Sequence, residues 1–109
     1  MSKQLDIKYR DKEYKLEFTR KSVEIMERQG FVASDVDDKP MTVLPALFAG
    51  AFIANHRYIN SKLIEEIYEH MRNKKELIGK LTEMYNEPIN ALLDEPEDEE
   101  GNAEWTASW

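Results

Sequence analysis

The feature that most constrains the fold is a stretch without any charge, residues 41–54 (Met-Thr-Val-Leu-Pro-Ala-Leu-Phe-Ala-Gly-Ala-Phe-Ile-Ala). In a chain of which 34% of the residues are charged, a segment apolar on all sides must be covered by the rest of the chain. Its 14 residues are too few to span a bilayer, so the pattern predicts a buried helix. We expect Thr42 to be its N-cap, with Pro45 tolerated in the first turn.

Helical spacing divides this predicted helix into two faces. One face is broad and apolar, and it comprises Leu44, Leu47, Phe48, Ala51 and Phe52. The other is a stripe of small residues spaced by four (Ala46, Gly50 and Ala54), where another backbone can approach closely. Two interpretations stay open here: a core helix within one chain, or an interface with the same or another protein.

The N-terminal residues alternate between apolar and polar side chains. The apolar positions are Leu5, Ile7 and Tyr9, then Tyr14, Leu16 and Phe18, with the polar run 10–13 between them. This period of two predicts an antiparallel hairpin with one buried face. Because a lone hairpin is marginal in water, we expect that face to pack on helices.

Capping signals predict the remaining helices. Thr19 is placed to cap a helix over residues 20–29, and Gly30 is placed to end it in the left-handed conformation. Residues 34–39 are typical of a solvated loop that Pro40 closes.

Two amphipathic helices are expected to follow. Asn60 or Ser61 is placed to cap the first, which runs through Met71, and Asn73 with Glu76 resembles a capping box for the second. Pro88 is expected to kink or end that second helix. The short connection predicts that the two pack antiparallel. The chain is therefore expected to be α+β and mainly α, with a hairpin packed on about four helices.

The charge is divided unevenly along the chain. Residues 1–93 contain all 15 Lys and Arg and an equal number of Asp and Glu, so the net charge of -7 comes from residues 94–109. The run 94–100 (Asp-Glu-Pro-Glu-Asp-Glu-Glu) cannot build a core, and we expect a disordered acidic tail after a globular domain of residues 1–93. Both tryptophans, Trp105 and Trp109, lie at its end, which favours a segment that becomes ordered on binding over a solubilising tail whose tryptophans fold back onto the body.

Composition argues against several classes of function. The chain has no cysteine, which fits a reducing compartment and removes disulfides and thiolate metal sites. A neutral body and an acidic tail lack the clustered cations of a nucleic-acid-binding surface. The first ten residues have no apolar core of a signal peptide.

No arrangement of residues indicates catalysis, a metal or a cofactor. His56 and His70 are the only histidines, and Glu66 with His70 supplies only two of the ligands that a metal needs. The serines lack a nucleophile motif, and the four glycines are scattered singly. We therefore expect a protein that is not an enzyme. A metal protein using His56, His70 and the acidic residues 65–69 is kept as a rival hypothesis.

Several segments together resemble a known family. They are residues 14–31 (Tyr-Lys-Leu-Glu-Phe-Thr-Arg-Lys-Ser-Val-Glu-Ile-Met-Glu-Arg-Gln-Gly-Phe), Lys-Pro-Met at 39–41, Leu-Phe-Ala-Gly-Ala-Phe at 47–52 with His56 and Arg57, Leu-Thr-Glu-Met-Tyr-Asn-Glu-Pro at 81–88, and the ending 101–109. Their order resembles that of the tail assembly chaperones of long-tailed phages (siphoviruses) and prophages of Gram-positive bacteria.

The resemblance implies a protein of the host cytoplasm that is absent from the mature virion. Such chaperones bind the tape measure protein, keep it soluble, recruit tail tube subunits and commonly form homo-oligomers. They often exist in two forms, the longer made by ribosomal frameshifting. No membrane, nucleic acid or cofactor is implied.

The residues that we expect to contact partners form two groups. One lies on the predicted central helix and the other at the C-terminus: Leu44, Leu47, Phe48 and Phe52, then Trp105 and Trp109. The alternative hypothesis is a small acidic regulator that blocks a basic protein surface through residues 94–100.

Overall fold

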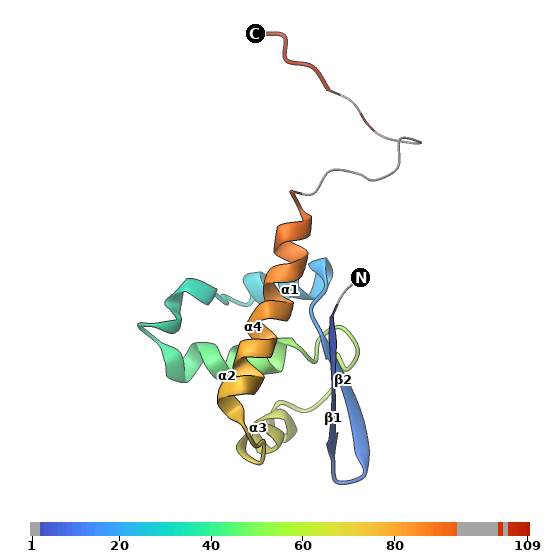
Figure 1. Cartoon of the computed structure of the whole chain (residues 1–109), viewed down its shortest axis with the longest axis vertical. Helices are drawn as coiled ribbons and strands as arrows, with labels where there is room; N and C mark the ends of the chain where they lie inside the picture. Colours follow the sequence, from blue (N-terminus) through green and yellow to red (C-terminus); the bar gives the residue numbers. More distant parts are fainter. Residues whose placement is uncertain (1–2, 94–102, 104) are drawn as a thin grey trace.

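A computed structural model describes residues 3–93, 103 and 105–109 of the chain and has the predicted α+β architecture (Figure 1). The elements, in order, are β1 (Gln4–Tyr9), β2 (Lys12–Glu17), α1 (Arg20–Arg28), the short 3-10 helix η1 (Ala33–Val36), α2 (Pro40–Gly50), α3 (Ser61–Glu69) and α4 (Lys74–Ala91). A hairpin followed by four α-helices is thus confirmed. The predicted disordered run 94–100 lies outside the described residues.

The hairpin turns more tightly than the sequence indicated. Its loop has two residues, Arg10 and Asp11, with φ of 48° and 66°, because a turn that follows the twist of the strands needs positive φ at both positions. In the register, Ile7 pairs with Tyr14 and Leu5 with Leu16. These four side chains share one face of the hairpin, and that face is directed into the core.

Helix α1 begins and ends as predicted. The Thr19 hydroxyl accepts a hydrogen bond from the Ser22 amide, and the Ser22 hydroxyl accepts one from the Thr19 amide. After the helix, Gly30 has φ of 92°, and the Phe31 amide donates to the Met26 carbonyl at 3.0 Å. This Schellman arrangement folds Phe31 back, so that its ring meets Tyr85 of α4 at 5.4 Å between centroids.

The start of α2 differs from the prediction. The helix begins at Pro40, and the carbonyl of Lys39 accepts from the amides of Thr42 and Val43. Proline suits the first helical position because its φ is fixed and its missing amide has no partner there. Thr42 therefore lies inside the helix and is not its N-cap, and Pro45 falls beyond the first turn. The helix ends at Gly50, and turns continue to residue 55.

The expected N-cap of α3 is confirmed, but that of α4 is wrong. The Asn60 side chain accepts a hydrogen bond from the Lys62 amide at 2.8 Å. Asn73 instead has a left-handed backbone, with φ of 54°, and its side chain caps nothing, so the predicted capping box with Glu76 does not form.

Helix α4 is also longer than predicted, and it has different neighbours. It continues through Pro88 as far as Ala91. The left-handed residue Asn73 redirects the chain between α3 and α4, and both helices pack on α2 instead of lying antiparallel along each other. In Figure 1, α4 crosses α2, while α3 lies at one end of the molecule.

Helix α2 and the turn after it lie at the centre of the core. Leu47, Phe48, Ala51 and Phe52 are buried, and the Phe48 ring lies 5.2 Å from Phe52 and 5.0 Å from Tyr68 between centroids. Around them pack Leu16 and Phe18 of the hairpin region, Val23 and Met26 of α1, Ile64 and Ile67 of α3, and Leu77, Leu81, Met84 and Tyr85 of α4. Four of the five residues on the broad face of the charge-free segment are therefore buried within one chain, and Leu44 is half-buried. No helix among the described residues is long and apolar enough to cross a membrane.

The outer edge of β2 is covered by the segment that leaves α2. The Glu17 amide donates to the Ala51 carbonyl at 3.1 Å, and the Lys15 amide donates to Nε2 of His56 at 3.0 Å. The Asn55 side chain donates to the Lys15 carbonyl at 3.2 Å. These bonds satisfy outward-pointing groups of an edge strand and fasten the hairpin to the core helix. His56 thus accepts this hydrogen bond through Nε2.

The two threonines provide a test of the helix boundaries. We expect Thr19→Ala to lower the free energy of unfolding by about 1 kcal/mol, because it removes a side-chain cap. Thr42→Ala is expected to change it by less than about 0.5 kcal/mol, because Thr42 caps nothing. Urea denaturation of both variants measures the difference, and equal losses would contradict the observed start of α2.

Candidate partner-binding groove

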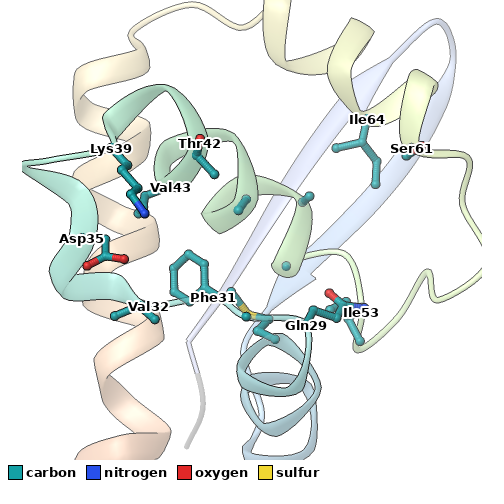
Figure 2. A pocket seen from close by; sticks show the side chains of 15 residues that line it. Gln29, Phe31, Val32, Asp35, Lys39, Thr42, Val43, Ile53, Ser61 and Ile64 are labelled. Atoms are coloured by element: carbon teal, nitrogen blue, oxygen red, sulfur yellow. The ribbon is translucent and has the colours of Figure 1, made fainter.

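The outer side of α2 is hollowed around Ala46 and Ala49, whose side chains are small. One hollow, of about 450 Å³, lies between α2, the C-terminal end of α1, η1 and the start of α3. Figure 2 shows it with the Phe31 ring near its middle, Asp35 and Lys39 towards one side, and Ile64 and Ser61 of α3 on the other. We call it the Phe31 hollow. Its remaining apolar lining includes Met26, Val32, Val43, Ala46, Ala49 and Ile53.

A second hollow adjoins the first. It has a volume of about 440 Å³ and is lined by Met41, Pro45, Phe48 and Tyr68, among others; we call it the Met41 hollow. The two hollows share the side chains of Ala46, Ala49, Ser61 and Ile64. The two hollows therefore lie next to each other over α2; we call the pair the α2 groove, and Ala46 and Ala49 line both of its parts.

The chemistry of the α2 groove is apolar, with charges towards its ends. Asp35 and Lys39 line the Phe31 hollow, and Glu65 and Glu69 line the Met41 hollow. Met41 is 89% exposed, and a flexible methionine at an open surface can adapt to different neighbours. An apolar floor with charges at its edges suits a helix of another protein.

The three residues of the predicted small-residue stripe have different surroundings in the structure. Ala46 lies at the junction of the two hollows, where its small side chain leaves room. At Gly50 the close neighbour is the Met26 side chain of α1, which occupies the space that a Cβ atom would need. Ala54 is exposed and lies outside the α2 groove. Of the three, Ala46 lines both hollows, Gly50 lines the Phe31 hollow but is packed against Met26, and Ala54 lines neither.

The six residues expected to contact partners lie in three different environments. Leu47, Phe48 and Phe52 are buried in the core, and Leu44 is half-buried. Trp105 and Trp109 are exposed, at 82% and 102%. Leu47 and Phe52 line neither hollow, and Phe48, which borders the Met41 hollow, is 0% exposed, so we do not retain these three as contact residues. Their role is to hold α2 in place under the groove.

A further apolar surface lies where α4 ends. Ile89, Leu92 and Leu93 are exposed there, and Leu92 lines a hollow against α1 with Val23. This surface directly precedes the acidic run that begins at Asp94.

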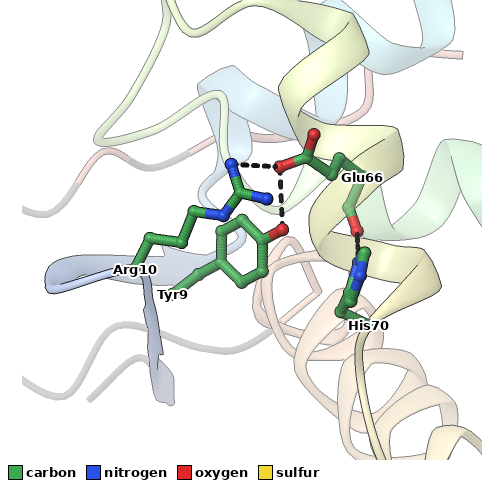
Figure 3. Close-up of polar contacts among 4 residues, drawn as sticks. All are labelled: Tyr9, Arg10, Glu66 and His70. Carbon is green, nitrogen blue, oxygen red and sulfur yellow. Dashed lines mark hydrogen bonds and ion pairs between the residues drawn. The ribbon is translucent and has the colours of Figure 1, made fainter.

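The pair Glu66 and His70, considered as metal ligands in the rival hypothesis, is engaged in other contacts (Figure 3). The Tyr9 hydroxyl donates to Oε2 of Glu66 at 2.7 Å, and the Arg10 guanidinium lies 3.5 Å from the same oxygen. Nδ1 of His70 lies 2.9 Å from the Glu66 carbonyl oxygen. The hydrogen bond to the Glu66 carboxylate raises the pKa of Tyr9, which keeps the phenol protonated as the donor.

These contacts fasten the tip of the hairpin to α3. Within residues 3–93, 103 and 105–109, no three His, Cys, Asp or Glu side chains gather closely enough to hold a metal ion. The arrangement is a set of surface polar contacts between two elements.

Several residues of the α2 groove were not identified from the sequence. Phe31 and Val32 follow the glycine that ends α1, and no sequence pattern marked them as surface contacts. Val43, Ile53 and Ile64 resemble ordinary core residues in the pattern. The one available signal was the spacing of small residues, which marked Ala46.

Comparison with known proteins gives a family without a described function. Residues 1–109, the whole chain, match the model of a family described as a domain of unknown function, DUF5055, and the chain belongs to that family. No curated protein and no solved structure matches the chain.

The two exposed tryptophans provide a test of the C-terminal segment. They are the only tryptophans of the chain, so tryptophan fluorescence reports on this segment alone. We expect emission typical of indole in water, unchanged in wavelength when urea unfolds the body. Replacing both with alanine is expected to change the free energy of unfolding by less than about 0.5 kcal/mol. Blue-shifted emission that reddens on unfolding would show instead that they pack on the body.

Proposed function

We propose that this protein is a non-enzymatic chaperone of phage tail assembly, which holds an apolar helix of the tape measure protein in the α2 groove. The observation that carries the proposal is the groove itself: an apolar, open depression whose floor is made of small residues on a helix fixed in the core. The phage role comes from the resemblance of the sequence segments, and the family description adds no function to it.

The groove has the properties that an apolar client helix requires. Ala46 and Ala49 allow the backbone of a second helix to approach α2 closely. Phe31 and Val32 on one side, and Met41 and Tyr68 on the other, offer apolar contacts for residues spaced by three or four along that helix. Binding here would bury client surface that otherwise aggregates in water.

The C-terminal tryptophans supply a second contact in this proposal. Each presents a large apolar ring to solvent, which is costly unless a partner covers it. A segment tethered to the body binds at a raised effective concentration once the groove is occupied. We propose that Trp105 and Trp109 bind the client or the tail tube subunit that the chaperone recruits.

The test is co-expression with a tape measure protein of a phage that encodes this chain. We expect the tape measure protein to stay soluble and to purify with the chaperone. Ala46→Arg is expected to abolish this, because a long charged side chain at the junction of the hollows fills the groove. The matched control is Ala54→Arg, the same change at an exposed alanine outside the groove, which is expected to leave client solubility intact.

The outcome also separates the proposal from its rival. A client held by apolar contacts stays bound as salt is raised. If the complex dissociates steeply with salt and does not respond to Ala46→Arg, binding depends on charge, and the acidic regulator is the better interpretation. A tape measure protein that precipitates with the wild type and both variants alike would refute the chaperone.

A further inference from the structure

The two edges of the hairpin differ in whether their outward backbone groups are hydrogen-bonded. The outward amides of Lys15 and Glu17 in β2 donate to His56 and Ala51, so these two residues direct their backbone groups away from β1. Their partners in the register are Asp6 and Gln4 of β1. In an antiparallel pair, residues opposite each other direct their backbone groups the same way, both inward or both outward. Gln4 and Asp6 therefore direct theirs away from β2.

The same alternation adds Lys8, so that the outer edge of β1 presents the backbone groups of Gln4, Asp6 and Lys8. Among the described residues, none of these groups has a hydrogen-bond partner outside the hairpin. The edge of β2 is thus covered, whereas the outward backbone groups of β1 have no partner among the described residues and can bond to an added strand.

We propose that a second copy of this chain occupies that edge, with β1 pairing antiparallel to β1 of its partner about a twofold axis at Ile7. Residues that pair across the new interface must both direct their backbone groups outward. Asp6 and Lys8 satisfy this condition, and the axis at Ile7 places Asp6 of each copy opposite Lys8 of the other. Twofold axes at Asp6 or at Lys8 would instead place like charges opposite each other, which is unfavourable.

The side chains of the whole sheet agree with this register. Within one hairpin, Asp6 lies opposite Lys15 and Lys8 opposite Glu13. Across the four strands of the dimer, one row on the solvent face would consist of Lys15 and Asp6 of one copy followed by Lys8 and Glu13 of the other. The twofold axis generates a second row with the same residues in the reverse order. The charges alternate in sign at every step, and each neighbouring pair attracts.

The core-facing row through the axis is apolar. It would comprise Tyr14 and Ile7 of one copy followed by Ile7 and Tyr14 of the other. A lysine alone on an edge strand discourages pairing with another strand. Here Asp6 precedes Lys8 by two residues, so with the twofold axis at Ile7 each of these charges lies opposite a charge of the other sign. Because a six-residue edge is small for an interface, we expect a weak dimer that forms as concentration rises.

Charge exchange provides the test, with sedimentation velocity over a wide range of concentrations. Asp6→Lys makes both edge charges positive, and Lys8→Asp makes both negative. Each variant alone is expected to dimerise about tenfold more weakly than the wild type, since two attractive pairs become repulsive. An equimolar mixture is expected to recover the wild-type association, because the two positive edge positions of one variant then face the two negative edge positions of the other.

Two further proteins complete the experiment. The double variant D6K/K8D restores opposite charges within one chain and is expected to dimerise like the wild type. Lys62→Asp on α3 makes the same charge change as Lys8→Asp away from the edge and is expected to have no effect. A wild type that stays monomeric at every concentration would overturn the proposal. So would a dimer that is unaffected by the single exchanges or is not recovered by mixing.

Discussion

The burial of α2 is the constraint on which the rest of the structure depends. A helix without charge cannot remain in water, and here the hairpin, α1, α3 and α4 each supply side chains that cover its inner face. Phe48 and Phe52 fill the space between these elements, and the small side chains of Ala46 and Ala49 lie on the outer face. The same helix therefore organises the core and forms the floor of the groove. A rigid floor helps recognition, since less conformational entropy is lost when a partner binds.

The segment after α2 extends this organisation to the hairpin. Ala51, Asn55 and His56 bind the outward backbone groups of β2, while Tyr9 and Arg10 at the hairpin tip reach Glu66 of α3. Covering one edge of a two-stranded sheet leaves the other as the place where the sheet can grow. The α2 groove and the β1 edge are built from different elements, so the proposed client binding and the proposed self-association use different surfaces.

The sequence predicted the elements well wherever local chemistry decides them. The alternation around the hairpin, the cap at Thr19 and the glycine stop at Gly30 all appear as expected, because each is a local backbone requirement. The prediction failed where two local signals compete. Helix α2 begins at Pro40 and not after Thr42, because a proline at the first helical position fixes the backbone without losing a hydrogen bond.

The candidate site was predictable only in part, because it depends on tertiary structure. Periodicity identified the apolar face of α2 but could not distinguish a core face from a binding face, and Leu47, Phe48 and Phe52 belong to the core. The groove combines α2 with Phe31 and Ile64, which are distant in sequence, and no local pattern joins them. The left-handed backbone at Asn73 likewise depends on the path between α3 and α4.

The central claim is that the outer face of α2 is where the client binds. The most direct measurement is amide hydrogen exchange of this protein in a purified complex with the tape measure protein, compared with the protein alone. The account predicts slower exchange at residues 31–32, at the amides of α2, and at the start of α3, with little change on the outer edge of β2. Unchanged exchange across α2, with protection confined to the C-terminal segment, would contradict it.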